Sequence, residues 1–287
     1  NRAKNFGMLG AAFGLGFIIG PYLGGRLSTP DTSFYGLFDT PSWFGATTPF
    51  WFAAILSLAN CASILTMFPE TLKEKFHGGR IKISRAVSNV VGGFKSDRLR
   101  VVLMAGFLFS AGFTFFTTFF GVYLRNNFNF SSAKIGDYFA IVGLFIAISQ
   151  AVVVAKVAKK LADWKVLRFS MFGLGTMMLV YFVIPTSSSS YLYLVIPFFT
   201  LFNGLTMANM SSLISRSAEM GQQGQAMGIY SSVSSLAQVP ASILVGYITS
   251  DITSSQPLFV SSACIILGGA VFFVLFKPKY VMENAHA

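Results

Sequence analysis

Charged residues are scarce in this sequence, and acidic ones are the scarcest. Only 11% of the 287 residues are charged, and 10 Asp and Glu stand against 21 Lys and Arg. An ordinary soluble domain carries about 25% charged residues. The composition therefore argues against a soluble globular protein.

The residues that build common enzyme sites are also few. His77 and His286 both lie in polar segments, and Cys61 and Cys264 lie in apolar segments without a metal-ligand spacing. No Ser-His-Asp set and no nucleotide-binding G-x-x-x-x-G-K-[ST] motif occurs in the chain. We therefore expect no enzyme activity, no bound metal, no cofactor and no ATP-driven step within this chain.

Long apolar runs are abundant instead, since 54% of residues are hydrophobic and the mean hydropathy is +0.65. A bilayer core about 30 Å thick is crossed by a helix of roughly 20 apolar residues. Eight such segments, too many for a secretory signal, predict an all-α polytopic membrane protein in contact with the lipid bilayer. They cover residues 5–26, 47–69, 101–124, 133–155, 167–185, 191–214, 226–249 and 257–276.

The basic residues are distributed by loop. All except Arg26, Arg125 and Lys134 fall in the N-terminal segment, the loops at 70–100 and 156–168, the segment around Arg216, or the C-terminal tail. Short loops rich in Lys and Arg stay in the cytoplasm, so we expect both ends of the chain on the cytoplasmic side. The net charge of +11 therefore reflects topology, and we expect no nucleic acid partner.

The basic segment 70–100 divides the chain into residues 1–69, with two helices, and residues 101–287, with six. Its apolar residues follow a helical period, which predicts an amphipathic helix. Such a helix would lie on the membrane surface or pack beneath the helix bundle. The residues on this period are Ile83, Val87, Val90, Val91 and Phe94.

A weak internal repeat relates the first and seventh segments. Residues 6–25 align with 227–246, so that Gly7 meets Gly228 and Gly25 meets Gly246. Parallel repeats of this kind occur in transporters. If each repeat has six helices, four helices are expected before residue 1. We also expect the protein to act as a monomer.

The stretch "GFIIGPYLGG" places its glycines and proline at Gly16, Gly20, Pro21, Gly24 and Gly25. It resembles the G-x-x-x-G-P-x-x-G-G signature of the fifth helix in the major facilitator superfamily, particularly its drug:proton antiporter branch, which includes the tetracycline efflux proteins. "RAKNFG" (2–7), "FPETL" (68–72) and "GQQGQAMG" (221–228) also resemble that branch.

The resemblance implies that the eight segments are helices five to twelve of a twelve-helix bundle. It places the first segment at the contact between the two halves, against the presumed eighth helix. Gly16, Gly20 and Gly24 fall close to one face of this segment, where they would let a neighbouring backbone approach. Pro21 would bend the helix, and the motif would serve packing or gating.

A second signature of the family, G-x-L-A-D-R-x-G-R-R, has a weaker echo in "KKLADWKVLR" (159–168). This loop keeps Asp163 and Arg168 but has Trp164 where the family has an arginine. The departure argues against a gating role for Asp163.

The resemblance further implies a secondary active transporter that works by alternating access. We expect it to export a drug-like or amphipathic small molecule against proton entry, across a plasma membrane such as the bacterial inner membrane. A solute uptake permease of the same superfamily and a non-transporting membrane receptor or scaffold are the alternatives.

No acidic residue stands in the middle of an apolar segment, although ionisable groups there are usually functional. Asp137 comes nearest, and we expect it to pair with Lys134 or with the N-terminus of its helix. In the family, intramembrane acids often lie in the first and fourth helices, outside this sequence.

The family's cavity is lined by helices one, four, seven and ten. In the presumed seventh helix, Ser110, Thr114 and Thr117 form a hydroxyl stripe, beside an aromatic stripe that includes Phe113 and Phe116. Hydroxyls would suit a water-facing wall and rings a greasy substrate. The alternative is helix packing through the hydroxyls, with the rings toward lipid.

In the presumed tenth helix, Asn203, Thr206 and Met210 share one face. An amide in hydrocarbon is costly unless it is bonded, so Asn203 is our first candidate for ligand contact. Three further amides, expected in interhelical hydrogen bonds, are Asn60, Gln150 and Gln238.

Overall fold

A computed structural model describes residues 15–16, 18–30, 39–68, 83–157, 160–218, 222–248 and 256–278, and these are mainly helical. Residues 18–27 form the first helix. The later elements are α2 (Thr48–Met67), α3 (Ile83–Lys95), α4 (Arg100–Phe128), α5 (Ser132–Ile148), the π-helix η1 (Ser149–Val154), α6 (Ala155–Val157), α7 (Asp163–Val183), α8 (Ser190–Ser217), α9 (Gln223–Ile248) and α10 (Gln256–Leu275).

Six helices of the described chain are long and apolar enough to cross a membrane: Thr48–Met67, Arg100–Phe128, Ser132–Val154, Asp163–Val183, Ser190–Ser217 and Gln256–Leu275. They coincide with six of the eight predicted segments, which are thereby confirmed as long apolar helices. The segment at 226–249 coincides with α9, a helix of 26 residues. The segment at 5–26 lies partly outside the described residues.

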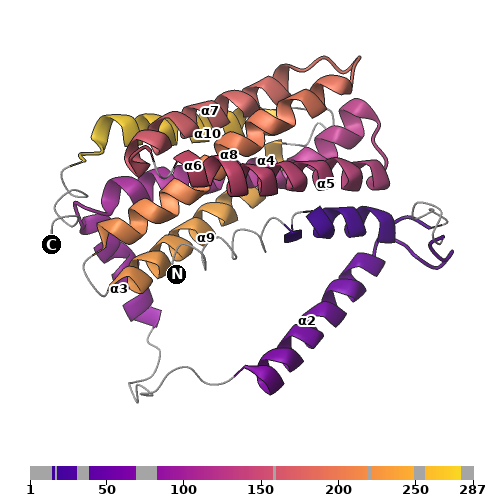
Figure 1. Ribbon diagram of the computed structural model, residues 1–287, viewed down its shortest axis with the longest axis horizontal. Coiled ribbons are helices and arrows are strands. Elements are labelled where there is room, and N and C mark those ends of the chain that lie inside the picture. The colour runs from indigo at the N-terminus through magenta and orange to yellow at the C-terminus, as the bar shows by residue number, and fades with distance from the viewer. Residues whose placement is uncertain are drawn as a thin grey trace.

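The helices from α4 onward form one bundle, in which α4 is central (Figure 1). It packs along α10 and α9, while α7 packs between α8 and α10. The core of this bundle is apolar and aromatic, with large side chains such as Leu103, Met171 and Phe272 completely buried.

The amphipathic helix α3 packs beneath the bundle, so the structure favours one of the two expected locations. Its Gly93 is buried, and a Cβ there would stand 2.9 Å from the Ile229 side chain and 3.1 Å from that of Leu103. Val90 and Phe94 are partly buried against the same core. Val90, Gly93 and Phe94 of α3 thus lie against the ends of α4 and α9, while Val91 is exposed.

The connection between α4 and α5 is short and well capped. Asn129 ends α4 in the left-handed conformation, with φ of 54°. The side chain of Ser131 accepts a hydrogen bond of 3.2 Å from the backbone N–H of Lys134 and so caps the start of α5. These caps turn the chain directly from one span into the next.

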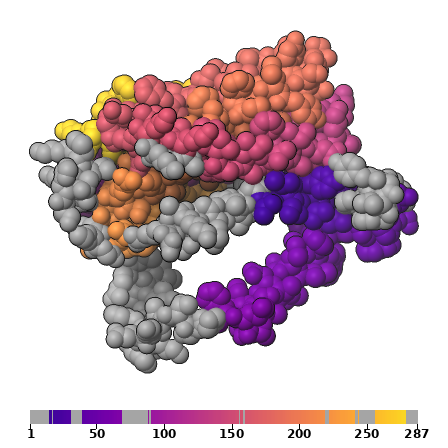
Figure 2. Space-filling model, viewed as in Figure 1, coloured from indigo at the N-terminus to yellow at the C-terminus, as the bar shows by residue number. Residues whose placement is uncertain are grey.

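In contrast, α2 stands away from the bundle, as Figure 2 also shows. None of its residues is buried, and large side chains such as Trp51, Leu58 and Leu65 are more than two-thirds exposed. A helix this apolar is stable only where lipid or another protein surface covers it.

Candidate functional site

The hydroxyl stripe of α4 is split between a helix contact and an exposed surface. Ser110 is buried, and its Oγ donates a hydrogen bond of 3.0 Å to Ser234 Oγ of α9. Thr114 is half-buried and donates to the backbone carbonyl of Ser110, while the exposed Thr117 donates to that of Phe113. Ser110 therefore follows the helix-packing alternative, and Thr117 lies on open surface.

The aromatic stripe of α4 lies largely inside the bundle. Phe116 is 3% exposed, and its ring centroid lies 4.5 Å from Phe120 and 4.9 Å from Phe199 of α8. Phe113 is half-buried and stacks on Phe109 at 5.8 Å. Phe116 thus fills the core in this conformation. It neither faces lipid nor lines an open cavity.

Sequence reasoning missed a tyrosine cluster that joins four helices. The hydroxyls of Tyr138 (α5) and Tyr181 (α7) lie 2.9 Å apart, and Tyr123 (α4) donates a 2.6 Å hydrogen bond to the backbone carbonyl of Tyr181. Tyr138 also reaches the carbonyl of Leu192 in α8, at 3.4 Å. Tyr123 and Tyr181 lie near the C-terminal ends of α4 and α7, and Tyr138 lies near the N-terminal end of α5. Because successive spans run in opposite directions, these positions share one level of the bundle, which is the signal by which the sequence could have linked them.

On the predicted cavity face of α8, some polar side chains have hydrogen-bond partners and others do not. Thr206 is fully buried and donates a 2.9 Å hydrogen bond to Ser170 Oγ of α7. Met210 is also fully buried. Asn203 is 4% exposed, and its Oδ1 has no hydrogen-bond partner within the described residues. Ligand contact by Asn203 stays a prediction, and its oxygen is the unsatisfied atom among the three predicted residues of this face.

A second unsatisfied polar atom, the hydroxyl of Ser149, lies near this face, where η1 meets α8. A Cβ on Gly204 would stand 3.2 Å from Ser149 Oγ and 3.6 Å from Gln150 Nε2. Ser149 is 5% exposed, and its Oγ has no partner in the described part of the chain. The wider turns of a π-helix are often found at functional sites.

The other two amides expected in interhelical bonds, Asn60 and Gln238, are exposed on α2 and α9.

A shallow hollow of about 550 Å³ runs along the outer face of α9. None of the predicted cavity residues lines it. Its walls are formed by Ser231, Ser232, Ser235, Leu236, Val239 and Pro240. The hydroxyls of Ser232 and Ser235 donate 3.0 Å hydrogen bonds to the backbone carbonyls of Gly228 and Ser231, so they are satisfied within α9 itself.

The degenerate loop motif links helices instead of standing free. Asp163, at the start of α7, lies 3.1 Å from Arg216 Nε near the end of α8 and also accepts a hydrogen bond from Ser212. Arg168 donates to the backbone carbonyl of Phe276, at 3.1 Å. The guanidinium of Arg168 lies 4.8 Å from the centroid of the Trp164 ring. Trp164, which stands where the family has an arginine, therefore makes a cation–π contact with Arg168.

The first helix lies against α5, as the family resemblance led us to expect for the presumed fifth and eighth helices. A Cβ on Gly25 would stand 2.5 Å from the Ser132 carbonyl oxygen and 3.1 Å from Gly136 Cα. One on Gly143 would stand 2.6 Å from the backbone nitrogen of Ile18. We call the contact of residues 18–27 with α5 the 18–27/α5 interface. Its backbones touch because glycine occupies these positions.

Within that interface, the expected roles of the other motif glycines are corrected. A Cβ on Gly16, Gly20 or Gly24 would meet no atom of the described chain within 4 Å. Gly25 makes the close approach instead, and the Pro21 carbonyl lies against Gly136. The glycines at a spacing of four therefore face away from α5.

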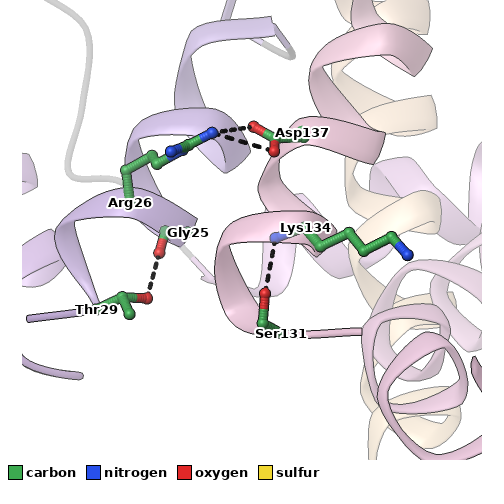
Figure 3. A network of polar contacts seen from close by, with 6 residues as sticks. All are labelled: Gly25, Arg26, Thr29, Ser131, Lys134 and Asp137. Carbon is green, nitrogen blue, oxygen red and sulfur yellow. Dashed lines mark hydrogen bonds and ion pairs between the residues drawn. The ribbon is translucent and has the colours of Figure 1, made fainter. Parts of the chain in front are cut away.

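An ion pair closes the same interface, and Figure 3 shows it. Arg26 Nη2 lies 3.1 Å from both carboxylate oxygens of Asp137. Of the two partners expected for Asp137, Lys134 was wrong, because its ammonium points to the Phe130 ring, 4.1 Å from the centroid. The actual partner stands 111 residues earlier in the chain, beyond the reach of local spacing rules.

Acidic and metal-ligating groups are otherwise dispersed. Among the residues that the structure describes, no three His, Cys, Asp or Glu side chains lie close enough together to hold a metal ion. In the described part of the chain, the polar features are thus hydroxyls, amides and ion pairs between helices, among them Arg26–Asp137 and Arg216–Asp163.

Apolar spans, buried hydroxyls and amides, and a glycine-mediated interface define a multi-span helical membrane protein that lies in the lipid bilayer. Residues 1–242 match the family model described as Major Facilitator Superfamily. The chain belongs to this superfamily.

Two curated relatives and one solved structure illustrate the similarity. The tetracycline resistance protein, class H, of Pasteurella multocida is 26% identical over 255 residues, which cover 87% of this chain and 58% of that protein. The hippocampus abundant transcript-like protein 1 of Mus musculus is 25% identical over 307 residues, covering 97% of this chain and 57% of that one. The human organic anion transporter MFSD10 (TETRAN) superposes with a TM-score of 0.67 at 20% identity, over 94% of this chain and 63% of that chain.

The structural match shows that the two proteins share a fold. The chain spans somewhat more than half the length of the curated relatives it matches.

Proposed function

We propose that this protein is a secondary active transporter that exports a drug-like or amphipathic small molecule in exchange for protons, by alternating access. Membership of the major facilitator superfamily supports transport. The tetracycline resistance proteins among its relatives favour efflux. The organic anion transporter with the same fold suggests that acidic amphipathic solutes also belong among the substrates to be tested.

The observation that carries the proposal is the unsatisfied amide of Asn203. Leaving a buried polar group without a hydrogen bond costs about 1–3 kcal/mol. Asn209, on the same helix and equally buried, has no buried side-chain atom without a partner among the described residues, and its Nδ2 donates a 2.7 Å hydrogen bond to the Leu205 carbonyl. An amide oxygen held open inside a membrane bundle is suited to bind a solute when the bundle opens.

The hydroxyl face of α9 supports the same proposal. Its hollow is lined by three serines, and Ser234 on the neighbouring face bonds Ser110 of α4. The hydroxyls of α4 and α9 therefore meet at the Ser110–Ser234 contact, and we place α9 beside the proposed solute path.

The proposed transporter needs no cofactor, because the proton gradient supplies the energy. We place residues 1–69 in one half of the bundle and residues 101–287 in the other, with 70–100 as the cytoplasmic linker. The basic loops put both ends of the chain in the cytoplasm. The protein acts as a monomer in a plasma membrane, the inner membrane in a bacterial source, without enzymatic activity or a nucleic acid partner.

Transport into inverted membrane vesicles that contain the full natural protein tests the proposal. Vesicles energised by respiration should accumulate tetracycline or an anionic dye such as fluorescein, and a protonophore should abolish the accumulation. Asn203→Ala should lower the initial rate about tenfold, which corresponds to about 1.4 kcal/mol of lost binding. The matched control Asn209→Ala should stay within about twofold of the natural protein, since its amide bonds its own helix.

Two outcomes would count against this proposal. Accumulation in right-side-out vesicles, with none in inverted ones, would favour the uptake alternative. Equal rates for Asn203→Ala and the natural protein would remove Asn203 from the solute path.

A further inference from the structure

The 18–27/α5 interface joins two parts of the chain that lie on opposite sides of the basic linker. The first helix contributes Ile18 and Pro21 to the contact, and α5 contributes Gly136 and Gly143. These contacts are made by backbone atoms, which cannot move apart by a change of rotamer. Separation of the two helices therefore has to occur as a rigid movement.

The Arg26–Asp137 ion pair stands at one end of this interface, directly beside the closest backbone contact. The Arg26 side chain is 13% exposed and that of Asp137 is 36% exposed. Arg26 also lies over the Tyr22 ring, 5.6 Å from its centroid, which holds the guanidinium toward α5. A pair that is partly shielded from water and held on a rigid backbone resists screening better than one on flexible surface chains.

The other described cations closest to Asp137 in the sequence are Lys134 and Arg125. Lys134, one turn before Asp137, is directed at the Phe130 ring. Arg125, in the last turn of α4, is exposed. Arg26 is thus the cation that the structure brings against the Asp137 carboxylate, as Figure 3 shows.

We propose that the Arg26–Asp137 pair is a latch that keeps the non-cytoplasmic end of the 18–27/α5 interface closed, and that it breaks whenever the solute path opens toward that side. The proposal rests on the alternating access proposed above, and it assigns a conformational role to two residues outside the solute path. Loss of either charge raises the population of the open state, whereas exchange of the two charges keeps the latch.

Accessibility of a cysteine within the interface measures this population directly. Ala140 suits the purpose, because it is half-buried and lies on the face of α5 shared by Gly136 and Gly143. Ala140→Cys is introduced after Cys61 and Cys264 are replaced by alanine. Intact cells that express the full natural protein with these changes are then treated with a membrane-impermeant maleimide, and the rate of labelling is followed.

Arg26→Ala and Asp137→Asn should each raise the labelling rate about fivefold or more, the lower end of usual conformational coupling. Asp137→Asn keeps the shape of the side chain, so its effect reports charge. The double variant with Arg26→Asp and Asp137→Arg should return the rate to that of the parent. Arg125→Ala, which removes an exposed positive charge near the start of the same α4–α5 connection, should leave the rate unchanged.

Unchanged labelling in Arg26→Ala and Asp137→Asn would overturn the latch. So would rapid labelling in the charge-exchanged variant, because it would assign the effect of the single variants to disturbed packing. Labelling needs no solute, so it separates the two proposals. If labelling confirms the latch but the vesicles accumulate neither tetracycline nor fluorescein, the transport function alone is refuted. If the vesicles accumulate solute but Arg26→Ala and Asp137→Asn label at the parent rate, the latch alone is refuted.

Discussion

Replacing Gly136 by alanine tests whether the 18–27/α5 interface depends on direct backbone contact. The added methyl group would stand 2.8 Å from the Pro21 carbonyl oxygen and 3.3 Å from Gly25 Cα. Non-bonded heavy atoms favour separations of about 3.5–4.0 Å. The two helices would therefore have to separate by roughly half an ångström or more, because both neighbours are backbone atoms.

The magnitude follows from a comparison with Gly20→Ala. Both variants gain about 1 kcal/mol of helix propensity. Only Gly136→Ala suffers from overpacking, which typically costs about 1–3 kcal/mol, since a Cβ on Gly20 meets no described atom within 4 Å. The propensity gain cancels between the two variants, so their stabilities should differ by about 2 kcal/mol.

Thermal unfolding in detergent, followed by tryptophan fluorescence, measures the difference. With about 2–4 °C per kcal/mol for a chain of this size, Gly136→Ala should unfold about 4–8 °C below Gly20→Ala. Equal unfolding temperatures would refute the contact between the two backbones. A lower temperature for Gly20→Ala would place the interface on the opposite face of the first helix.

Two further predictions concern contacts within the bundle. A double-mutant cycle of Ser110→Ala and Ser234→Ala should give a coupling energy of about 0.6 kcal/mol in thermal unfolding, the usual value for a hydrogen bond between membrane helices; additive effects would mean that the bond does not form. Arg168→Lys should destabilise the protein by about 1 kcal/mol, because an ammonium cannot reproduce the planar contact with Trp164 together with the hydrogen bond to the Phe276 carbonyl just after α10. Lys160→Ala, which removes an exposed charge before the start of α7, should change little, and a loss as large as that of Arg168→Lys would contradict the reasoning.

The spans were predictable because membrane crossing imposes its signal on every residue of a helix. A row of about 20 apolar residues is rare outside membrane spans, and the distribution of Lys and Arg divided the loops without any tertiary information. The contact between the first helix and α5 was also expected, through the family resemblance. It is present at Gly25 and Gly136.

The detail of that contact was not predictable from one helix alone. Gly16, Gly20 and Gly24 form the more obvious stripe, but Gly25 lies about 100° further round the helix and makes the contact. Both faces are apolar, so their composition could not choose between them. The deciding information lay in α5, where Gly136 and Gly143 are seven residues apart and therefore share a face.

Pairs between distant polar residues were missed for a related reason. Local spacing offers Asp137 a partner at Lys134, whereas its actual partner Arg26 is brought near only by the packing of whole helices. The hydroxyls of Tyr138 and Tyr181 meet in the same way, across two spans. Asn203 could be selected from the sequence, because an amide in an apolar segment is unusual. The sequence did not indicate that its oxygen would lack a hydrogen-bond partner.

The π-helix at Ser149–Val154 has a consequence for how this sequence should be aligned with others. A π-turn holds an additional residue within one turn of an α-helix, so everything after it is rotated by about 100° relative to α5. A homologue that lacks one residue in this stretch could continue as a regular α-helix with all later side chains in equivalent directions. Between this protein and such a homologue, a single-residue gap at 149–154 would be the structurally correct alignment, even though gaps inside membrane spans are normally penalised.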